Sequence, residues 1–267
     1  MKTAQTPCLK SKNNLPFREL FQDELVAGFS NRLSGNMSLN CGDIRESLAN
    51  RRSFLGSLGI DHRGLVCAKQ IHSANIKRAG LFEKGAGALA YQTALADTDA
   101  IITNENNLPI AILSADCLSI FLYDPASRSI GLVHAGWRGT QEKIASKTIA
   151  AMSSEFNARP EDIRVFFGPA IRSCCYQVNE EFQDKFREGL LLRKGDFFLD
   201  LAGINKEQLS HCGVDPAKIT DCSVCTVCLN KEYFSFRKEA SFCGRIMSVM
   251  MLNYGGIYGS EKNRACR

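Results

Sequence analysis

Three side chains of the sequence, far apart along the chain, could together bind a metal ion. Cys117 lies between two apolar runs, His134 ends a third run, and His72 follows a shorter apolar segment. Two imidazoles and one thiolate leave a fourth coordination position open for water, phosphate or a substrate oxygen, which is the usual plan of a catalytic zinc site. These ligand types suit zinc or copper and exclude magnesium and calcium.

The same three residues also allow a chemistry without metal. Cys117 could act as a nucleophile with His134 or His72 as its general base, as in a cysteine hydrolase. A buried cysteine, however, more often serves packing, and a buried histidine is more often a hydrogen-bonded core residue. The sequence contains no HExxH motif that would decide between these interpretations.

The residues after His134 indicate where an anion could bind. Residues 136–140 form a glycine-containing turn that leads into a predicted helix, and Arg138 lies within it. Backbone N–H groups at the start of a helix attract anions, so a phosphate bound there would lie within reach of a metal held by His134. An ordinary passage from strand to helix uses the same small residues.

A second group of cysteines near the C-terminus offers fewer ligands. Cys222, Cys225 and Cys228 are spaced three residues apart, and the last two form a CxxC pair. A structural zinc site needs four ligands, and no fourth ligand follows nearby. Because the cysteines alternate with valines, the edge of a strand is the favoured interpretation and no second metal is expected. We expect most of the twelve cysteines, the pair Cys174-Cys175 included, to be small buried residues.

Composition describes an ordinary globular protein. The 267 residues suffice for one large domain or two small ones, and 45% of them are hydrophobic and 23% charged. The net charge of +5 suits anionic ligands, but no basic block predicts binding of nucleic acid. No apolar run approaches the roughly 20 residues of a membrane span, and the N-terminus lacks the apolar region of a secretory signal. We expect a cytoplasmic protein with reduced cysteines.

Short apolar runs and helix caps predict the elements that hold the candidate residues. The runs 110–113 and 118–123 predict buried strands on either side of Cys117, and a turn at Asp124-Pro125 should pair the second with a strand over residues 130–133. Helices are expected from the cap at Asp43, over residues 141–156, from Asn179 through Phe182, Phe186 and Leu190, and from Asp200 to Gly213. Further strands are expected over residues 24–33, 65–68, 98–103, 163–167, 233–237 and 245–252.

These elements interleave without a regular repeat, which determines the expected fold class. We expect an α+β (or α/β) fold, a single layered domain with mixed β-sheets flanked by helices. Residues 1–15 should form a flexible polar tail and residues 16–267 the one catalytic domain. Since no apolar surface helix is left over, a monomer is expected.

Ordered motifs over most of the chain resemble the YfiH-like, or laccase-domain, family. The sequence Ala115-Asp116-Cys117 before an apolar strand, the HAGWRG motif that begins at His134, and residues 70–73 carry this resemblance. Further matching motifs lie at residues 28–33, 39–40, 96–100, 168–171, 174–178, 225–226, 234–237 and 244–245.

The resemblance implies a zinc-dependent purine nucleoside phosphorylase that acts on adenosine, inosine, guanosine and methylthioadenosine with phosphate, and that also deaminates adenosine. Alignment of the motifs places the metal ligands, which are also catalytic residues, at His72, Cys117 and His134. The family has also been described as a multicopper polyphenol oxidase. Such an enzyme needs many histidines, but the three ligands leave only His62 and His211. A single copper ion, bound in vitro, is the most that this inventory supports.

Four further residues are assigned roles by inference. The H-x-E signature of zinc nucleobase deaminases is absent, because Ala74 occupies the glutamate position after His72. Deamination would therefore need a different proton carrier, for which Asp116 is our candidate. Arg138 and Arg237 could hold phosphate, and Asn40 could hydrogen-bond ribose or base. A solvated surface position explains Asn40, Arg138 and Arg237 equally well. A protein that binds zinc without turning over a nucleoside is the third interpretation.

Overall fold

The hairpin predicted at Asp124-Pro125 lies at the centre of the larger of two packed sheets. In it, β6 (Leu118–Asp124) and β7 (Ser129–Ala135) pair antiparallel, with Leu118 opposite Ala135. The computed structural model describes residues 25–253, so the predicted tail over residues 1–15 and the expected domain boundary at residue 16 lie outside the described residues. The six-stranded sheet also contains β3 (Ile76–Arg78), β4 (Ala100–Thr103), β8 (Arg164–Phe167) and β12 (Ile219–Asp221), in the order β12-β8-β6-β7-β4-β3.

Both sheets mix parallel and antiparallel pairs, as the sequence predicts. In the larger sheet β12 runs parallel to β8 and β3 parallel to β4, while the other pairs are antiparallel. The second sheet has four strands in the order β1-β13-β5-β2. They are β1 (Leu25–Phe29), β2 (Val66–Cys67), β5 (Ile110–Ser114) and β13 (Ile246–Leu252), and only the pair of β2 with β5 is parallel.

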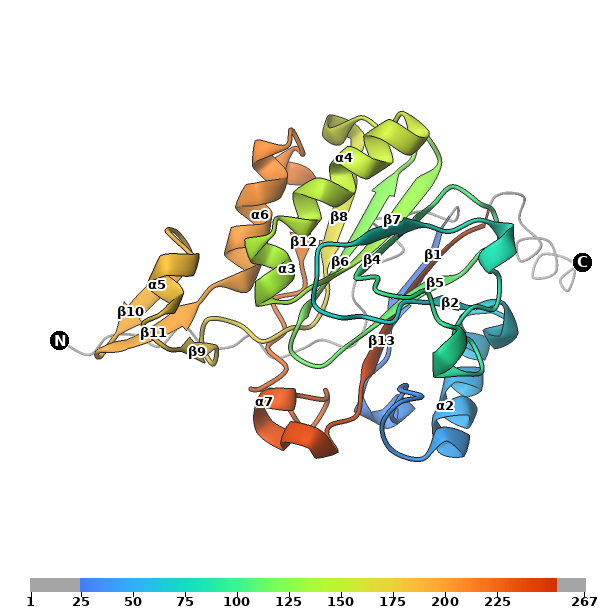
Figure 1. Cartoon of the computed structure of the whole chain (residues 1–267), viewed down its shortest axis with the longest axis horizontal. Coiled ribbons are helices and arrows are strands. Elements are labelled where there is room, and N and C mark those ends of the chain that lie inside the picture. Colours follow the sequence, from blue (N-terminus) through green and yellow to red (C-terminus); the bar gives the residue numbers. More distant parts are fainter. Residues whose placement is uncertain (1–24, 254–267) are drawn as a thin grey trace, which may run out of the picture.

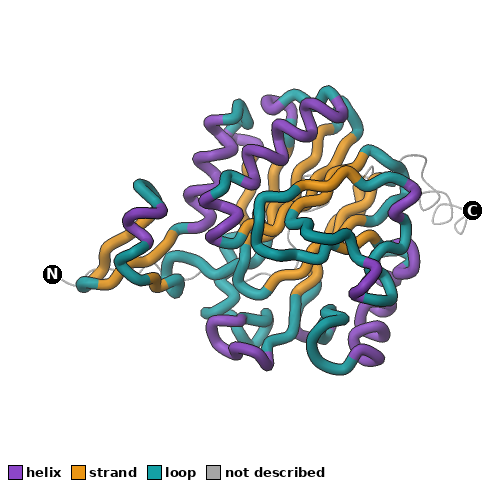
Figure 2. The backbone as a smooth tube through the Cα atoms, in the orientation of Figure 1, coloured by secondary structure: helices purple, strands orange, loops and turns teal. Residues whose placement is uncertain are grey.

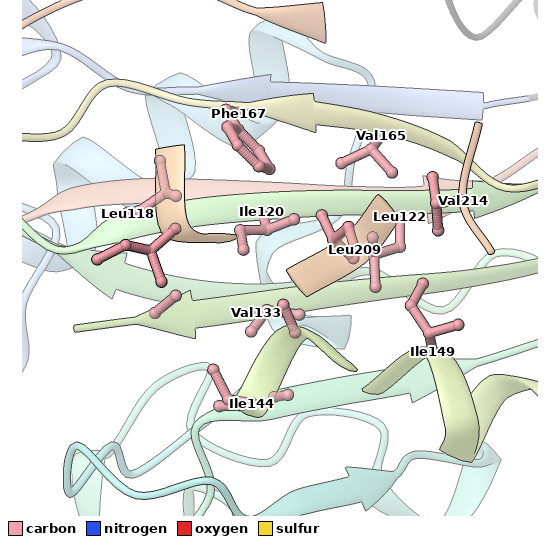
Figure 3. Close-up of a cluster of buried hydrophobic side chains, with 14 of the residues drawn as sticks. Leu118, Ile120, Leu122, Val133, Ile144, Ile149, Val165, Phe167, Leu209 and Val214 are labelled. Atoms are coloured by element: carbon pink, nitrogen blue, oxygen red, sulfur yellow. The ribbon is translucent and has the colours of Figure 1, made fainter. Parts of the chain in front are cut away.

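Alternation along the strands sorts side chains into separate cores. On β6, Leu118, Ile120 and Leu122 pack with α4 (Ile144–Phe156) and α6 (Leu201–His211), as Figure 3 shows. Phe121 and Tyr123 point to the opposite face, where they pack against the four-stranded sheet. Every residue of β6 is buried, as expected of an apolar strand that is covered on both faces.

The same alternation in β5 defines the remaining layer. Ile110 and Ile112 face the six-stranded sheet, whereas Ala111 packs in a cluster with Leu55 of α2 (Ile44–Ser57). The layers therefore follow in the order α4 and α6, six-stranded sheet, four-stranded sheet, α2. Figure 1 shows α4 and α6 on one side and α2 on the other. Within residues 25–253, no helix combines the length and apolar character needed to cross a membrane.

Local caps determine two of the predicted helices, and a third follows a separate short helix. The Asp43 side chain accepts from the N–H groups of Arg45 and Glu46 at the start of α2, and Asp200 caps α6 in the same way. The helix expected over residues 141–156 is confirmed as α4, and a separate short helix, α3 (Trp137–Gln141), precedes it. The chain breaks between them because Lys143 has a positive φ of 61°.

The helix expected from Asn179 through Leu190 is wrong. Only α5 (Phe182–Lys185) forms. Gly189, with φ of 78°, changes the direction of the chain, and a hairpin of two strands follows it. A small sheet of β9 (Gln177–Val178), β10 (Leu190–Arg193) and β11 (Asp196–Leu199) results, which projects from the body at the left of Figures 1 and 2. The spacing of phenylalanines does report burial, because Phe182 packs on Trp137 with ring centroids 5.1 Å apart.

The strand expected over residues 233–237 is also wrong. Tyr233 and Phe234 are buried in a small separate core, but the chain then forms α7 (Phe236–Glu239). The backbone N–H of Arg237 donates to the Asp116 carboxylate instead of to a neighbouring strand. The apolar run therefore indicated burial rather than extended structure.

Candidate metal centre

The structure brings His72, Cys117 and His134 to one point. Their potential ligand atoms lie within 4.8 Å of one another. The two imidazole rings have centroids 4.9 Å apart and planes inclined by 75°. His134 is buried, Cys117 is half-buried and His72 is exposed, so the group lies where the core meets solvent. The three side chains could therefore hold a metal ion that a solute can reach.

Strand register explains why three distant residues meet. In the β6–β7 pair Ser119 lies opposite His134, which brings Cys117 to the end of β7. In the β4–β7 pair Ala100 lies opposite Val133, which puts Asp99 beside His134. Because β3 runs parallel to β4, the loop before β3, which contains His72, lies beside the residue before β4.

Unusual backbone conformations surround the three candidate ligands. His72 has a φ of 61° and Asp116 a φ of 86°, in the left-handed region that costs such residues on the order of 1–3 kcal/mol. A Cβ atom on Gly136 would lie 3.0 Å from Cys117 Sγ and 3.2 Å from His72 Cδ2. The glycine after β7 is thus required by the space that the sulfur and the imidazole occupy.

Asp99, to which sequence reasoning assigned no role, holds two of the three candidate ligands. Its Oδ1 lies 2.9 Å from His134 Nδ1 and accepts the backbone N–H of His72 at 3.0 Å. Its Oδ2 accepts the N–H of Ile71 at 3.2 Å, and both the N–H and the hydroxyl of Ser73 at 2.7 and 2.8 Å. With Nδ1 engaged, His134 has Nε2 available for a metal.

One signal could have identified Asp99. In the sequence it is an acidic residue directly before an apolar run, inside the matching motif at residues 96–100. In the structure it is fully buried. Buried carboxylates occur where they are paired or fully hydrogen-bonded.

The charges at the site favour a thiolate. Burial alone would raise the pKa of Cys117, but the facing His134 and His72 lower it to about 6. Burial alone would lower the pKa of His134, but Cys117 and Asp99 raise it to about 9. Since a cysteine binds a metal as the thiolate and a histidine as neutral imidazole, a metal ion would replace the proton on His134 as the partner of the sulfur.

The three candidate ligands line a cavity of about 430 Å³, a size typical of small-molecule pockets. Its walls combine positive charge with aromatic faces. The residues that supply them are Arg138, Arg237 and Arg245, and Tyr91, Trp137, Tyr176 and Phe236. Such a lining suits an anionic group together with a planar ring.

The predicted substrate-binding residues Asn40, Arg138 and Arg237 all line this cavity and are exposed. The guanidinium of Arg138 lies 4.5 Å from the ring centroid of Trp137. The side chain of Arg237 donates to the carbonyl oxygen of Gln177 at 3.1 Å. Because α3 is only one turn long, an anion here would be bound more by the arginines than by a helix dipole.

Asp116 also lines the cavity, with both carboxylate oxygens hydrogen-bonded. Oδ1 accepts from the Thr226 hydroxyl and Oδ2 from the Arg237 N–H, each at 2.6 Å. Arg245, to which sequence reasoning assigned no role, donates to the carbonyl oxygen of Cys243 at 2.6 Å. The motif at residues 244–245 was the available signal for it.

The arrangement does not fit a multicopper cluster. Among the described residues, His62 lies beside Asp61, with Nδ1 and Oδ1 3.6 Å apart, and His211 ends α6; neither belongs to a group of side chains that could share a metal.

The expectation that Cys225 and Cys228 lack further ligands is wrong, because Cys174 and Cys175 lie against them. No spacing in the sequence links the two pairs, and the expectation that Cys174 and Cys175 are buried is also wrong, because Cys174 is exposed and Cys175 half-buried.

Comparisons with known proteins agree with this fold. The model of a family described as multi-copper polyphenol oxidoreductase laccase matches residues 26–253. The purine nucleoside phosphorylase YlmD of Geobacillus stearothermophilus is 33% identical over 225 residues, which cover 80% of this chain and 82% of that protein. The adenosine deaminase RL5 of an unidentified prokaryote is 29% identical over 236 residues and 84% of each chain. The crystal structure of the hypothetical protein YfiH of Bacillus licheniformis matches with a TM-score of 0.83 at 32% identity, covering 86% of this chain and 93% of that one.

Proposed function

Because this chain belongs to the multi-copper polyphenol oxidoreductase laccase family, we propose that it is a zinc-dependent purine nucleoside phosphorylase and not an oxidase. Its proposed substrates are phosphate with adenosine, inosine, guanosine or methylthioadenosine, and adenosine deamination is a proposed second activity. The grouping of His72, Cys117 and His134 at the wall of an arginine-lined cavity carries the proposal. The relatives named for phosphorolysis and for deamination support it.

In phosphorolysis a phosphate oxygen forms a bond to ribose C1′ while the bond from C1′ to the purine nitrogen breaks. The transition state resembles an oxocarbenium ion, so the enzyme gains most from positioning the anion beside C1′. In our proposal Arg138 and Arg237 hold phosphate, and the Asn40 amide bonds ribose or base. A zinc ion bound by the three candidate ligands would supply Lewis-acid stabilisation of an anionic oxygen in the same cavity.

Asp116 is the proposed proton carrier for deamination. Its carboxylate lines the cavity between the Thr226 hydroxyl and the Arg237 N–H. Each carboxylate oxygen that accepts one hydrogen bond keeps a further lone pair. The group can therefore exchange a proton with a bound substrate while it also holds the backbone of Arg237.

One observation favours a second candidate, a cysteine hydrolase. Asp99 lies on Nδ1 of His134, and His134 in turn faces the thiol of Cys117, as in a catalytic triad of cysteine, histidine and carboxylate. Metal analysis separates the two candidates. Stoichiometric zinc that protects Cys117 from alkylation supports the phosphorylase, whereas a metal-free and alkylatable Cys117 supports the hydrolase.

Copper is a competing occupant in vitro, because it binds sites with nitrogen and sulfur ligands more tightly than zinc does. A polyphenol oxidase that uses a single copper ion is the weaker alternative. Purification without added metal, followed by metal analysis, tests it. Copper in place of zinc together with oxidation of a phenol would favour the oxidase.

The direct experiment replaces Cys117 by Ala and measures phosphorolysis of inosine together with bound zinc. Cys212→Ala, at the C-cap of α6, is the matched control. We expect Cys117→Ala to contain about one zinc ion fewer per chain and to lose at least about 100-fold in kcat/KM, equal to about 2.7 kcal/mol of transition-state stabilisation. The control should keep both. Full phosphorolysis by Cys117→Ala without zinc would contradict the proposal.

A further inference from the structure

Four cysteine sulfurs converge where a turn before β9 meets a turn after β12. Cys174 and Cys175 lie in the first turn, and Cys225 and Cys228 in the second. The four Sγ atoms all lie within 4.8 Å of one another. The two turns are more than 50 residues apart in the chain, so only the tertiary structure brings the sulfurs together.

The sulfur separations match a tetrahedral metal site. A zinc–sulfur bond of about 2.3 Å gives a tetrahedron whose edges are about 3.8 Å long. Cys228 Sγ lies 3.6 Å from Cys174 Sγ and 3.4 Å from Cys175 Sγ. Both separations far exceed the about 2.0 Å of a disulfide, and their near equality means that Cys228 is not committed to one partner.

The surroundings of Cys225 suit a thiolate ligand. The residue is completely buried, and its backbone bridges to Ala170, which lies beyond the end of β8. The backbone N–H groups of Cys228, Arg172 and Val227 face its sulfur. Donors of this kind orient and stabilise metal-bound sulfur.

We propose that Cys174, Cys175, Cys225 and Cys228 bind a structural zinc ion that joins the two turns. Four sulfur ligands close the coordination sphere, so this zinc has no position for a substrate and its role is structural. Binding converts the thiols to thiolates and releases their protons to solvent. The site is separate from the group of His72, Cys117 and His134, with which it shares no residue.

The two joined turns also hold residues of the cavity wall. In the first turn and at the start of β9, which follows it, the carbonyl oxygens of Cys175 and Gln177 accept hydrogen bonds from the Arg237 side chain at 3.5 and 3.1 Å. In the second, the Thr226 hydroxyl donates to Asp116 at 2.6 Å. A metal that ties these turns together therefore holds Arg237 and Asp116 in a constant relation to each other.

The experiment counts zinc in the full-length protein, purified with reductant and dialysed against a weak chelator. Cys228→Ser is the test variant, because Cys228 is exposed and its replacement leaves the core intact. Cys212→Ser is the matched control. We expect about one zinc ion fewer per chain in Cys228→Ser and in Cys174→Ser, no change in the control, and a Tm lower by about 5 °C or more in the two variants. In cobalt-loaded protein the thiolate-to-cobalt absorption should fall strongly in Cys228→Ser.

Three results would overturn the inference. The first is a zinc content of Cys228→Ser equal to that of wild type. The second is alkylation of all four thiols in the zinc-loaded native protein, and the third is iron or a disulfide in place of zinc. The outcome does not depend on the proposed phosphorylase, because Cys117→Ala removes only the other centre. If the protein cleaves no nucleoside, the zinc content of Cys228→Ser still tests the proposed four-cysteine site.

Discussion

Changing Asp99 to Asn tests whether one buried carboxylate positions the candidate metal centre. The carboxylate accepts hydrogen bonds from the N–H groups of Ile71, His72 and Ser73, and it lies against His134 Nδ1. An asparagine side chain has only one oxygen and places an NH₂ group at the other position, where it meets donors. We therefore expect the loop around His72 and the ring of His134 to lose their defined orientation.

The size of the effect follows from the pKa of Asp99. Burial opposes its charge, but the hydrogen bonds from His134 and Ser73 prevail and lower the pKa from 3.8 to about 2. Because a tenfold change in an equilibrium constant equals about 1.4 kcal/mol, this lowering corresponds to about 2 kcal/mol in favour of the folded protein. Groups that hydrogen-bond metal ligands typically change metal affinity by about 10- to 100-fold, and we expect Asp99→Asn to weaken zinc binding within this range.

The pH dependence has a defined sign. Since the folded-state pKa of Asp99 lies below the unfolded-state value, its stabilisation is complete above about pH 4 and is lost as the pH falls toward about 2. Metal-free Asp99→Asn should therefore have a free energy of unfolding about 2 kcal/mol lower near pH 7. It should also lose less stability than wild type between about pH 4 and pH 2.

Urea unfolding of the metal-free proteins at several pH values measures the stability, and titration against a zinc-binding dye measures the affinity. Asp97→Asn is the control, because Asp97 is exposed and its φ of 47° is a conformation that asparagine tolerates. Equal zinc affinity in Asp99→Asn and wild type would refute the positioning role. An unchanged pH dependence would refute the lowered pKa.

Two further substitutions separate metal binding from folding. Gly136→Ala should weaken zinc binding at least about tenfold, because its Cβ would crowd Cys117 and His72 while the φ of −77° itself suits alanine. Zinc affinity equal to wild type would count against the proposed ligands. Arg51→Met should lower the free energy of unfolding in urea by about 3 kcal/mol, because the buried guanidinium donates to three backbone carbonyls. The exposed neighbour in Arg52→Met should change it by less than about 0.5 kcal/mol, and similar losses in both variants would contradict the argument.

Local sequence patterns were sufficient for the elements around the candidate metal centre. The apolar runs on either side of Cys117 form β5 and β6, and Asp124-Pro125 makes the turn into β7. Asp43 and Asp200 cap the helices that they were expected to cap. Each of these features depends on residues within a few positions of each other, so the sequence contains the necessary information locally.

The same kind of pattern failed where distant contacts decided the conformation. Phe182, Phe186 and Leu190 have helical spacing, but Gly189 and the pairing of β10 with β11 interrupt it. The apolar segment before Arg237 is buried without being a strand, because the backbone there bonds to Asp116. Periodicity reports which side chains are buried, and it does not specify which backbone groups are paired.

The sequence by itself determined the chemistry available to this protein: two histidines and a cysteine next to short apolar runs, a glycine-containing turn, and basic residues without a basic block. Only the tertiary structure decided which residues share a site. Asp99 reaches His134 because β4 and β7 pair in one register, and Cys174 reaches Cys228 because two separate turns meet. A shift of one residue in such a register would move every side chain to the opposite face, and that register depends on the packing of both sheets rather than on the residues near either ligand.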